Sequence, residues 1–318
     1  MKLLTFFLLP FLFPLLLSAQ VSVILDTDIG PDYDDVGAMA MLHSLADSGQ
    51  VNILATVASN QSKYTASVLS VLNTYFKRPE IPIGVVRGRG VNMVAWQKWD
   101  SLVVAKYPHK VKSNEQAEDA LSLYRRILAA QPDLSVTLVT VGFLTNMADL
   151  LISQPDKYSP LSGRELISRK VNKLVSMAGR FPSGKEFNVD RDPVSSKIVF
   201  DSWPTAIIFS GWEIGSKVHT GLPLTMNEKI KNSPVKDVFA MSIPLSKQDA
   251  NGRMSWDQTA VLVAVKGHEP YYNLEEGRFV AHDNGSNDWH PNGKGHYRLI
   301  EKMPVPQVEQ VLEALMAR

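Results

Sequence analysis

The chain has 318 residues, and its 33 basic residues nearly balance its 32 acidic residues, giving a formal net charge of +1. This balance excludes a domain-wide basic field for nucleic acid, and no block of Lys and Arg is suited to anionic lipid. The sequence contains no cysteine, which excludes a disulfide framework and a cysteine for lipid attachment. The length suits one large α/β domain or two smaller ones, and the lack of a low-complexity linker favours one.

The amino-terminal segment has the features of a secretory signal peptide. Lys2 provides a positive start, a long apolar run follows, and small residues end the segment. Pro10 and Pro14 interrupt the apolar run, which disfavours a permanent transmembrane anchor. We therefore predict that residues 1–19 are a signal peptide and that residues 20–318 form one exported domain, periplasmic or secreted, with no membrane anchor after cleavage.

An acidic turn, residues 26–35, follows the first predicted strand. Residues 21–25 are apolar and rich in β-branched side chains, which indicates a buried strand, and residues 36–45 have the character of a helix packed against it. The turn reads DTDIGPDYDD and contains Asp26, Asp28, Asp32, Asp34 and Asp35. Five like charges repel strongly, and a divalent cation with oxygen ligands is the natural group to hold them together. A helix N-cap with solvated acids would account for one or two aspartates but not for five.

Strands and helices then alternate along the chain. Strands are predicted at 52–58, 83–86, 135–141, 174–178 and 205–209, and helices at about 64–77, 115–130 and 193–201. Nearly continuous apolar strands separated by helices indicate an α/β fold with a mainly parallel central sheet and helices on both faces. Ligands of such sheets bind at the carboxyl ends of the strands. The polar segments at those ends, 26–35, 59–61, 142–146 and 179–192, are therefore expected to form one site.

Four motifs resemble those of the inosine/uridine-preferring nucleoside hydrolases, and they occur in the expected order. The acidic turn resembles the family's calcium motif, with two extra residues between the glycine and the paired aspartates. Residues 141–146, VGFLTN, resemble its turn after a central strand. Residues 186–188, EFN, followed by Asp192 and Pro193, resemble its substrate-binding segment. Residues 255–260, SWDQTA, resemble the late turn that supplies another metal-binding aspartate.

The resemblance implies a single-domain, Rossmann-like nucleoside hydrolase fold and calcium-dependent cleavage of ribonucleosides to free base and ribose. Such cleavage passes through an oxocarbenium-like transition state, and bound calcium can lower the pKa of the attacking water. The general base implied by the resemblance is Asp28, and the implied Ca²⁺ ligands are Asp28, Asp35, Asp257 and the carbonyl of Val141. The residues implied to hydrogen-bond the ribose hydroxyls are Asp34, Asn60, Glu186 and Asn188. The partner is a small nucleoside, with homo-oligomer formation left open.

Two segments depart from the family pattern. Many members carry a histidine before the late aspartate, where it can protonate the departing base, but here that position is Trp256. An indole N–H is not a useful general acid. Tryptophan at this place resembles the purine-preferring branch, whose aromatic residues stack on the base, and Trp96 or Trp99 is expected to supply the other face. Residues 180–185, RFPSGK, replace an expected glycine–asparagine pair that contacts the sugar.

Several residues keep more than one interpretation. Asp26 either contacts the metal indirectly or caps the turn, and Asp32 replaces or supplements a ligand. His43 is expected to be packed or on the surface. Residues 281–296 are rich in glycine and asparagine and are predicted to form a loop. That loop carries three histidines, one of which could supply an acid to the site: His282, His290 and His296.

Three alternative classes share part of this pattern. A haloacid-dehalogenase-type phosphatase requires threonine or valine two residues after the second aspartate, where this chain has Gly30. An EF-hand fails because Pro31 occupies its glycine position and Gly37 its terminal glutamate position. An exported nucleoside- or sugar-binding protein with little turnover remains open because the histidine is missing. Retention of Asp28 argues against it, since binding alone does not need a base.

Overall fold

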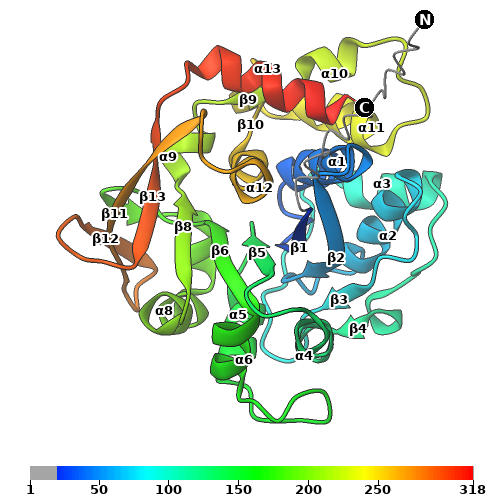
Figure 1. The fold of residues 1–318 in the computed structure, drawn as a ribbon. Helices are drawn as coiled ribbons and strands as arrows, with labels where there is room; N and C mark the ends of the chain where they lie inside the picture. Colours follow the sequence, from blue (N-terminus) through cyan, green and yellow to red (C-terminus); the bar gives the residue numbers. More distant parts are fainter. Residues whose placement is uncertain (1–19, 318) are drawn as a thin grey trace, which may run out of the picture.

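The computed structural model describes residues 20–317, and the predicted signal peptide, residues 1–19, lies outside the described residues. Within residues 20–317 the main sheet has eleven strands (Figure 1). Its parallel part consists, in spatial order, of β4 (Glu118–Asp119), β3 (Ile83–Val85), β2 (Val51–Ala58), β1 (Val21–Thr27), β5 (Val136–Thr140), β6 (Val171–Met177), β8 (Ala206–Ser210) and β13 (His296–Glu301). Three antiparallel strands extend it: β11 (Tyr272–Ala281), β12 (Ser286–His290) and β7 (Ser183–Lys185).

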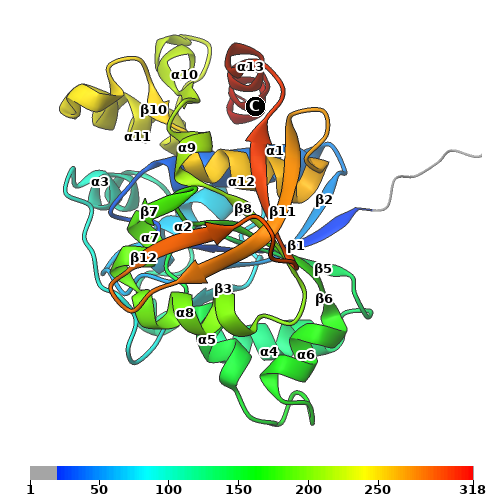
Figure 2. The ribbon, with the colours of Figure 1, turned by 90° about the vertical axis from the view of Figure 1, so that its left-hand side faces the viewer.

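Helices pack on both faces of this sheet (Figures 1 and 2), which confirms the predicted fold class. One face carries α1 (Asp34–Asp47), α2 (Thr65–Tyr75), α3 (Trp99–Lys106), α11 (Pro234–Ser242), α12 (Trp256–Lys266) and α13 (Val305–Met316). The other carries α4 (Ala120–Ala130), α5 (Thr145–Ile152), α6 (Gly163–Lys170) and α8 (Pro193–Ser202). Burial on both faces explains why the central strands are nearly continuous apolar runs.

Short elements complete the described chain. They are η1 (Asn114–Gln116), α7 (Phe187–Arg191), α9 (Trp212–Gly215), α10 (Leu222–Met226), η2 (Ile243–Leu245), η3 (Lys247–Asp249) and a two-stranded sheet of β9 (His219–Thr220) and β10 (Arg253–Met254). No helix within residues 20–317 combines the length and apolar character needed to cross a membrane.

The carboxyl ends of four neighbouring strands are level with one another. The register pairs Thr27 of β1 with Ala58 of β2, and Thr140 of β5 with both Asp26 of β1 and Ser176 of β6. The segments that follow these strands therefore emerge at the same edge of the sheet. Helix α12 packs beside α1, so the first turns of these two helices meet at that edge as well (Figure 1).

The prediction of a loop at residues 281–296 was wrong for residues 286–290, which form β12, and correct for the turns at 282–285 and 291–295. This segment contains the end of β11, all of β12 and the start of β13, which pair as antiparallel neighbours. Asn284 and Gly285 lie in the tight turn between β11 and β12, where Gly285 has a φ of +78°. In β12, Asn287 and Trp289 are buried while their neighbours are more exposed, which is the alternation of a strand with one covered face. The segment is thus a hairpin.

Candidate active site

A pocket of about 440 Å³ opens at the carboxyl edge of the sheet. Its wall combines acidic residues, most of them from the acidic turn, with aromatic residues from five separate segments. The acidic lining residues are Asp28, Asp32, Asp34, Asp35, Glu186, Asp249 and Asp257, and the aromatic ones are Tyr33, Trp96, Phe187, Trp212 and Trp256. The pocket therefore offers anionic groups and flat apolar surfaces to one ligand.

Local hydrogen bonds fix the shape of the acidic turn. The hydroxyl of Thr27 donates to Asp35 and accepts from the backbone N–H of Ile29 at 3.0 Å. Gly30 has a φ of +151°, and a Cβ there would lie 2.9 Å from the side-chain nitrogen of Asn60. Glycine is required at this position because the backbone conformation and the close approach both exclude a side chain. The turn thus holds Asp35 and its neighbours in defined places.

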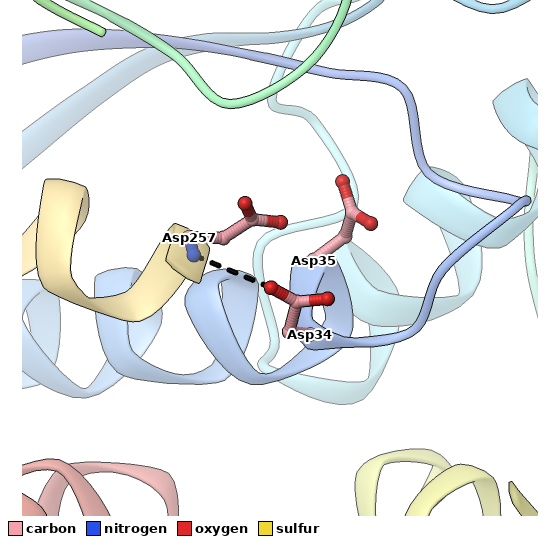
Figure 3. A group of neighbouring side chains, drawn as sticks. All are labelled: Asp34, Asp35 and Asp257. Atoms are coloured by element: carbon pink, nitrogen blue, oxygen red, sulfur yellow. Dashed lines mark hydrogen bonds between the residues drawn. The ribbon is translucent and has the colours of Figure 1, made fainter. Parts of the chain in front are cut away.

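Three carboxylates converge where α1 and α12 begin (Figure 3). Asp34, Asp35 and Asp257 each offer an oxygen, and these oxygens all lie within 4.8 Å of one another. Asp34 Oδ2 also accepts from the backbone N–H of Asp257 at 3.4 Å. Both helix N-termini favour negative charge at this point. The arrangement brings together acids that are more than 200 residues apart in the sequence.

Burial and mutual repulsion raise the pKa of Asp28, Asp35 and Asp257 well above the usual range. Within residues 20–317 none of the three forms an ion pair with Lys or Arg, and Asp35 Oδ2 is buried without a hydrogen-bond partner. Buried charge of this kind needs a counter-charge. An all-oxygen set of carboxylates and a nearby carbonyl suits a hard divalent cation such as Ca²⁺. The chemistry of these donors therefore fits the predicted ion.

Asp34 belongs to the same cluster, but the guanidinium of Arg253 already compensates its charge. Its Oδ1 accepts from Arg253 at 3.0 Å and 3.2 Å, so that oxygen is already engaged. Grouping by distance alone places Asp34 with Asp35 and Asp257. We regard Asp28 as the better third carboxylate for an ion, because a guanidinium already compensates Asp34. The predicted ribose-binding role of Asp34 is consistent with its place in the pocket wall.

Glu186 and Asn188 line the pocket at the start of α7. The carboxylate of Glu186 accepts from the backbone N–H of Asn188 at 2.9 Å and from those of Gly179 and Val189 at 3.2 Å. Burial raises the pKa of Glu186 to about 7, although these hydrogen bonds oppose the shift. The amide of Asn188 donates to the carbonyl of Val141 at 3.1 Å. Val141 lines the pocket, and its carbonyl keeps a second lone pair for another partner.

Asn60 is placed behind the pocket wall and does not line it. Its side-chain nitrogen donates to the carbonyls of Asp28 and Met93, at 3.0 Å and 2.8 Å, and its oxygen accepts from the N–H groups of Ser62 and Met93. The side chain is therefore fully used in joining the acidic turn to the segment that carries Trp96. This position differs from the direct ribose contact that the resemblance implies.

The aromatic residues divide into pocket and core. Trp256 lines the pocket and donates its indole N–H to the carbonyl of Trp212 at 2.8 Å. Trp96 is 60% exposed at the pocket, whereas Trp99 is fully buried in the core. Of the two candidates for a second stacking residue, only Trp96 is therefore placed to contact a ligand. Trp212 and Phe187 also line the pocket; Phe187 lies within the EFN motif but was given no role there, and no motif contains Trp212.

Arg253 is the main feature that the sequence did not reveal. Its guanidinium pairs with Asp32, with Asp34 at 3.0 Å and with Asp249 at 3.5 Å. Tyr33 donates its hydroxyl to Asp249 at 2.7 Å and lies beneath the same guanidinium. The structure thus gives Asp32, whose role was open, an arginine partner. The one sequence signal was a basic residue two positions before the SWDQTA motif.

Asp26 and the histidines do not line the pocket. Asp26 is fully buried and accepts from the Tyr124 hydroxyl at 2.8 Å and the Asn146 amide at 2.9 Å, and burial raises its pKa to about 7. His43 is packed in the core, as expected, and burial lowers its pKa to about 4. Among the residues that line the pocket there is no histidine. The described part of the 281–296 hairpin therefore supplies no acid to the pocket.

A pocket at the carboxyl edge of a parallel sheet, with aromatic walls and a few placed polar groups, is typical of a site for a small-molecule ligand. The family model described as inosine-uridine preferring nucleoside hydrolase matches residues 23–300. The chain belongs to this family and is a hydrolase of N-glycosyl bonds. Dependence on a metal ion is general in the family, and the buried acidic cluster agrees with it. The phosphatase alternative is thereby set aside.

Individual relatives differ in their substrates. The pyrimidine-specific ribonucleoside hydrolase RihA of Salmonella dublin is 28% identical over 245 residues, which cover 70% of this chain and 67% of the relative. RihA of Salmonella typhi is 29% identical over 61% of both chains. A purine-preferring ribonucleoside hydrolase from Gardnerella vaginalis has a similar structure, with a TM-score of 0.72, 15% identity, and coverage of 93% of this chain and 98% of that one. At this identity the structural likeness establishes the shared fold.

Proposed function

We propose that this chain is an exported, calcium-dependent hydrolase that cleaves ribonucleosides to free base and ribose, with a preference for purines. The observation that carries the calcium part is the buried set of Asp28, Asp35 and Asp257, which repel one another and have no cationic side chain as a partner within residues 20–317. Oxygen ligands from carboxylates and a carbonyl suit this ion.

The side chains in the pocket suit N-glycosidic cleavage. Asp28 is the proposed general base: it lines the pocket among the proposed calcium ligands, where a carboxylate can accept a proton from the attacking water. The anionic wall stabilises the positive charge that develops on the sugar. Calcium, when bound, supplies a water of lowered pKa and oxygen sites for the sugar diol. Glu186 and Asn188 line the pocket, which supports their proposed role in hydrogen-bonding the sugar hydroxyls.

Purine preference rests on the aromatic wall. Because no histidine lines the described pocket, the leaving base must be activated without one. A purine offers a larger face to Trp256 and a more basic nitrogen that solvent can protonate. Base–aromatic stacking contributes about 1–3 kcal/mol per base. The named relatives include both pyrimidine-specific and purine-preferring enzymes, so they do not favour either substrate class.

The lack of a histidine that could protonate the leaving base also supports a second candidate. This candidate is a nucleoside-binding protein of the same fold with little turnover. The two functions differ in one measurable respect. The purified chain, residues 20–318, is incubated with inosine, adenosine, uridine and cytidine, with calcium or with a chelator, and free base and ribose are measured. We expect purine turnover that calcium supports and chelation abolishes. Tight binding without release of base would establish the second candidate, and turnover indifferent to the chelator would overturn the calcium proposal.

Export and assembly are further parts of the proposal. The apolar segment that ends at Ala19 supports export, and its removal would leave Gln20 as the first residue. Mass spectrometry of the protein from cell fractions tests this directly. A mature amino terminus at Gln20 in the periplasm or medium is expected, and an intact cytoplasmic chain would contradict it. Light scattering of the purified protein decides whether the chain forms the homo-oligomer left open by the sequence.

A further inference from the structure

We propose that Arg253 is a positioning residue of the pocket: it acts as a built-in counter-cation for one half of the acidic wall and fixes the plane of Trp256. This inference deepens the proposed function and rests on its calcium site. It concerns a residue outside the motifs that define the family resemblance. Two observations carry it, the ion pairs of the guanidinium and its contacts with aromatic rings.

The guanidinium joins β10, which carries Arg253, to the acidic turn and to η3. It pairs with Asp32 and Asp34 of the acidic turn and, at 3.5 Å, with Asp249 at the end of η3. The arginine residue is only 6% exposed. Its planar fork can bind several carboxylates at fixed angles, which an ammonium group cannot do. Removing it would leave the buried carboxylates of Asp34 and Asp249 without a cation, which is strongly unfavourable.

The two extra residues of the acidic turn belong to this arrangement. They lengthen the turn between Gly30 and the paired aspartates, and Asp32 lies within the lengthened part. Asp32 pairs with Arg253, so the longer turn and the arginine form one unit. This unit neutralises part of the wall without using the oxygens of Asp35 and Asp257. The cation site is thereby limited to the remaining carboxylates.

The same guanidinium lies between two aromatic rings. Its central carbon is 4.9 Å from the ring centre of Tyr33 and 5.0 Å from that of Trp256. The indole N–H of Trp256 is held from another direction by the carbonyl of Trp212. Contacts on its face and at its edge fix the orientation of the indole. A leaving base therefore meets a ring whose plane is already set.

A matched arginine exists outside the pocket. Arg298 pairs with Glu275 at 2.9 Å and lies over the rings of Phe181 and Trp289, at 5.5 Å and 5.6 Å from their centres. It does not line the pocket. Arg298→Met therefore reports the cost of removing an arginine between two aromatic rings, without any effect on the acidic wall.

The experiment measures calcium affinity by calorimetry, and kcat and KM for inosine, in the wild type, Arg253→Met, Arg253→Lys and Arg298→Met, each as residues 20–318. Arg253→Met removes a positive charge beside the site, so calcium should bind at least about fivefold more tightly. Arg253→Lys keeps the charge but loses the fork, so calcium affinity should stay within about twofold of the wild type while kcat/KM falls roughly tenfold. Arg298→Met should match the wild type in both measurements.

Each outcome bears on the proposal. A wild type that binds no calcium overturns the calcium site and this inference with it. A wild type that binds calcium, with unchanged affinity in Arg253→Met, overturns the counter-cation role alone. An Arg253→Lys variant with wild-type kcat/KM overturns the positioning role, and it keeps the test decisive if Arg253→Met does not fold.

Discussion

The acidic wall of the pocket consists of two halves with similar carboxylates and different counter-charges. The arginine-paired half contains Asp32, Asp34 and Asp249, which share Arg253. The cation-free half contains Asp28, Asp35 and Asp257, for which the described residues provide no ion pair. Burial is nearly complete in both halves except at Asp32. The protein therefore compensates one half by itself, and under the proposal a cation from solution compensates the other.

The sharpest test of the cation-free half is replacement of the proposed general base, Asp28. Asp28→Asn should lower turnover on inosine by roughly 100-fold or more, because a lost general base typically costs 10²–10⁴-fold. The fold should be retained, since the amide has nearly the same shape. Release of free base and ribose measures the effect, with the exposed Asp201→Asn as the control variant. Near-normal turnover of Asp28→Asn would move the role to another carboxylate, Asp32 first.

A second prediction compares the two halves directly. Asp35→Asn and Asp257→Asn should each weaken calcium binding by at least about tenfold, or roughly 1.4 kcal/mol, because each removes a charged ligand. Asp32→Asn should change the affinity by less than about threefold, because the charge it removes is partly exposed and already paired. Calorimetric titration gives both values. Equal losses in the three variants would mean that the division into halves is wrong.

A third prediction concerns the aromatic wall. Trp256→Ala should lower kcat/KM for inosine roughly tenfold, within the range that 1–3 kcal/mol of stacking allows, and should leave calcium affinity unchanged. Trp96→Ala should have a smaller effect, because its indole is 60% exposed. Uridine serves as the comparison substrate and should be affected less. If Trp256→Ala cleaves inosine normally, or if the wild type prefers uridine, the indole only packs and the purine preference is rejected.

The smallest expected effect is on stability. Burial raises the pKa of Glu186 from 4.5 to about 7, so the folded protein binds more protons than the unfolded chain between these values. Stability from this group is therefore fully present below about pH 4.5 and is lost as pH rises through about 7. In chelator, the melting temperature should fall between pH 5 and pH 8, and less so in Glu186→Gln. An equal slope in Glu186→Gln would contradict this, and the exposed Glu118→Gln serves as the control.

Sequence motifs predicted the fold and the position of several pocket residues for a physical reason. Level ends of parallel strands bring the segments after them to one edge, so Asp28, Val141 and Glu186 could be placed together before the structure was known. Asp257 followed from its motif on α12. Their locations agree with the prediction, and their roles remain predictions that the variants above test.

The remaining features depend on contacts that no local pattern encodes. The pairing of Arg253 with Asp32 and Asp34 joins segments about 220 residues apart, and only the packing of α12 against α1 brings them together. The placement of Asn60 behind the wall depends on the course of the segment around Met93. Residues 281–296 were misread because glycine and asparagine mark hairpin turns as well as loops.

The most direct test of the account is the position of the bound ion. Crystals of residues 20–318 grown with calcium, measured at a long wavelength, would locate it by its anomalous signal. The account predicts one peak per chain in the cation-free half, about 2.3–2.6 Å from oxygens of Asp28, Asp35, Asp257 and the carbonyl of Val141. A peak among Asp32, Asp34 and Asp249, or no peak at saturating calcium, would contradict it.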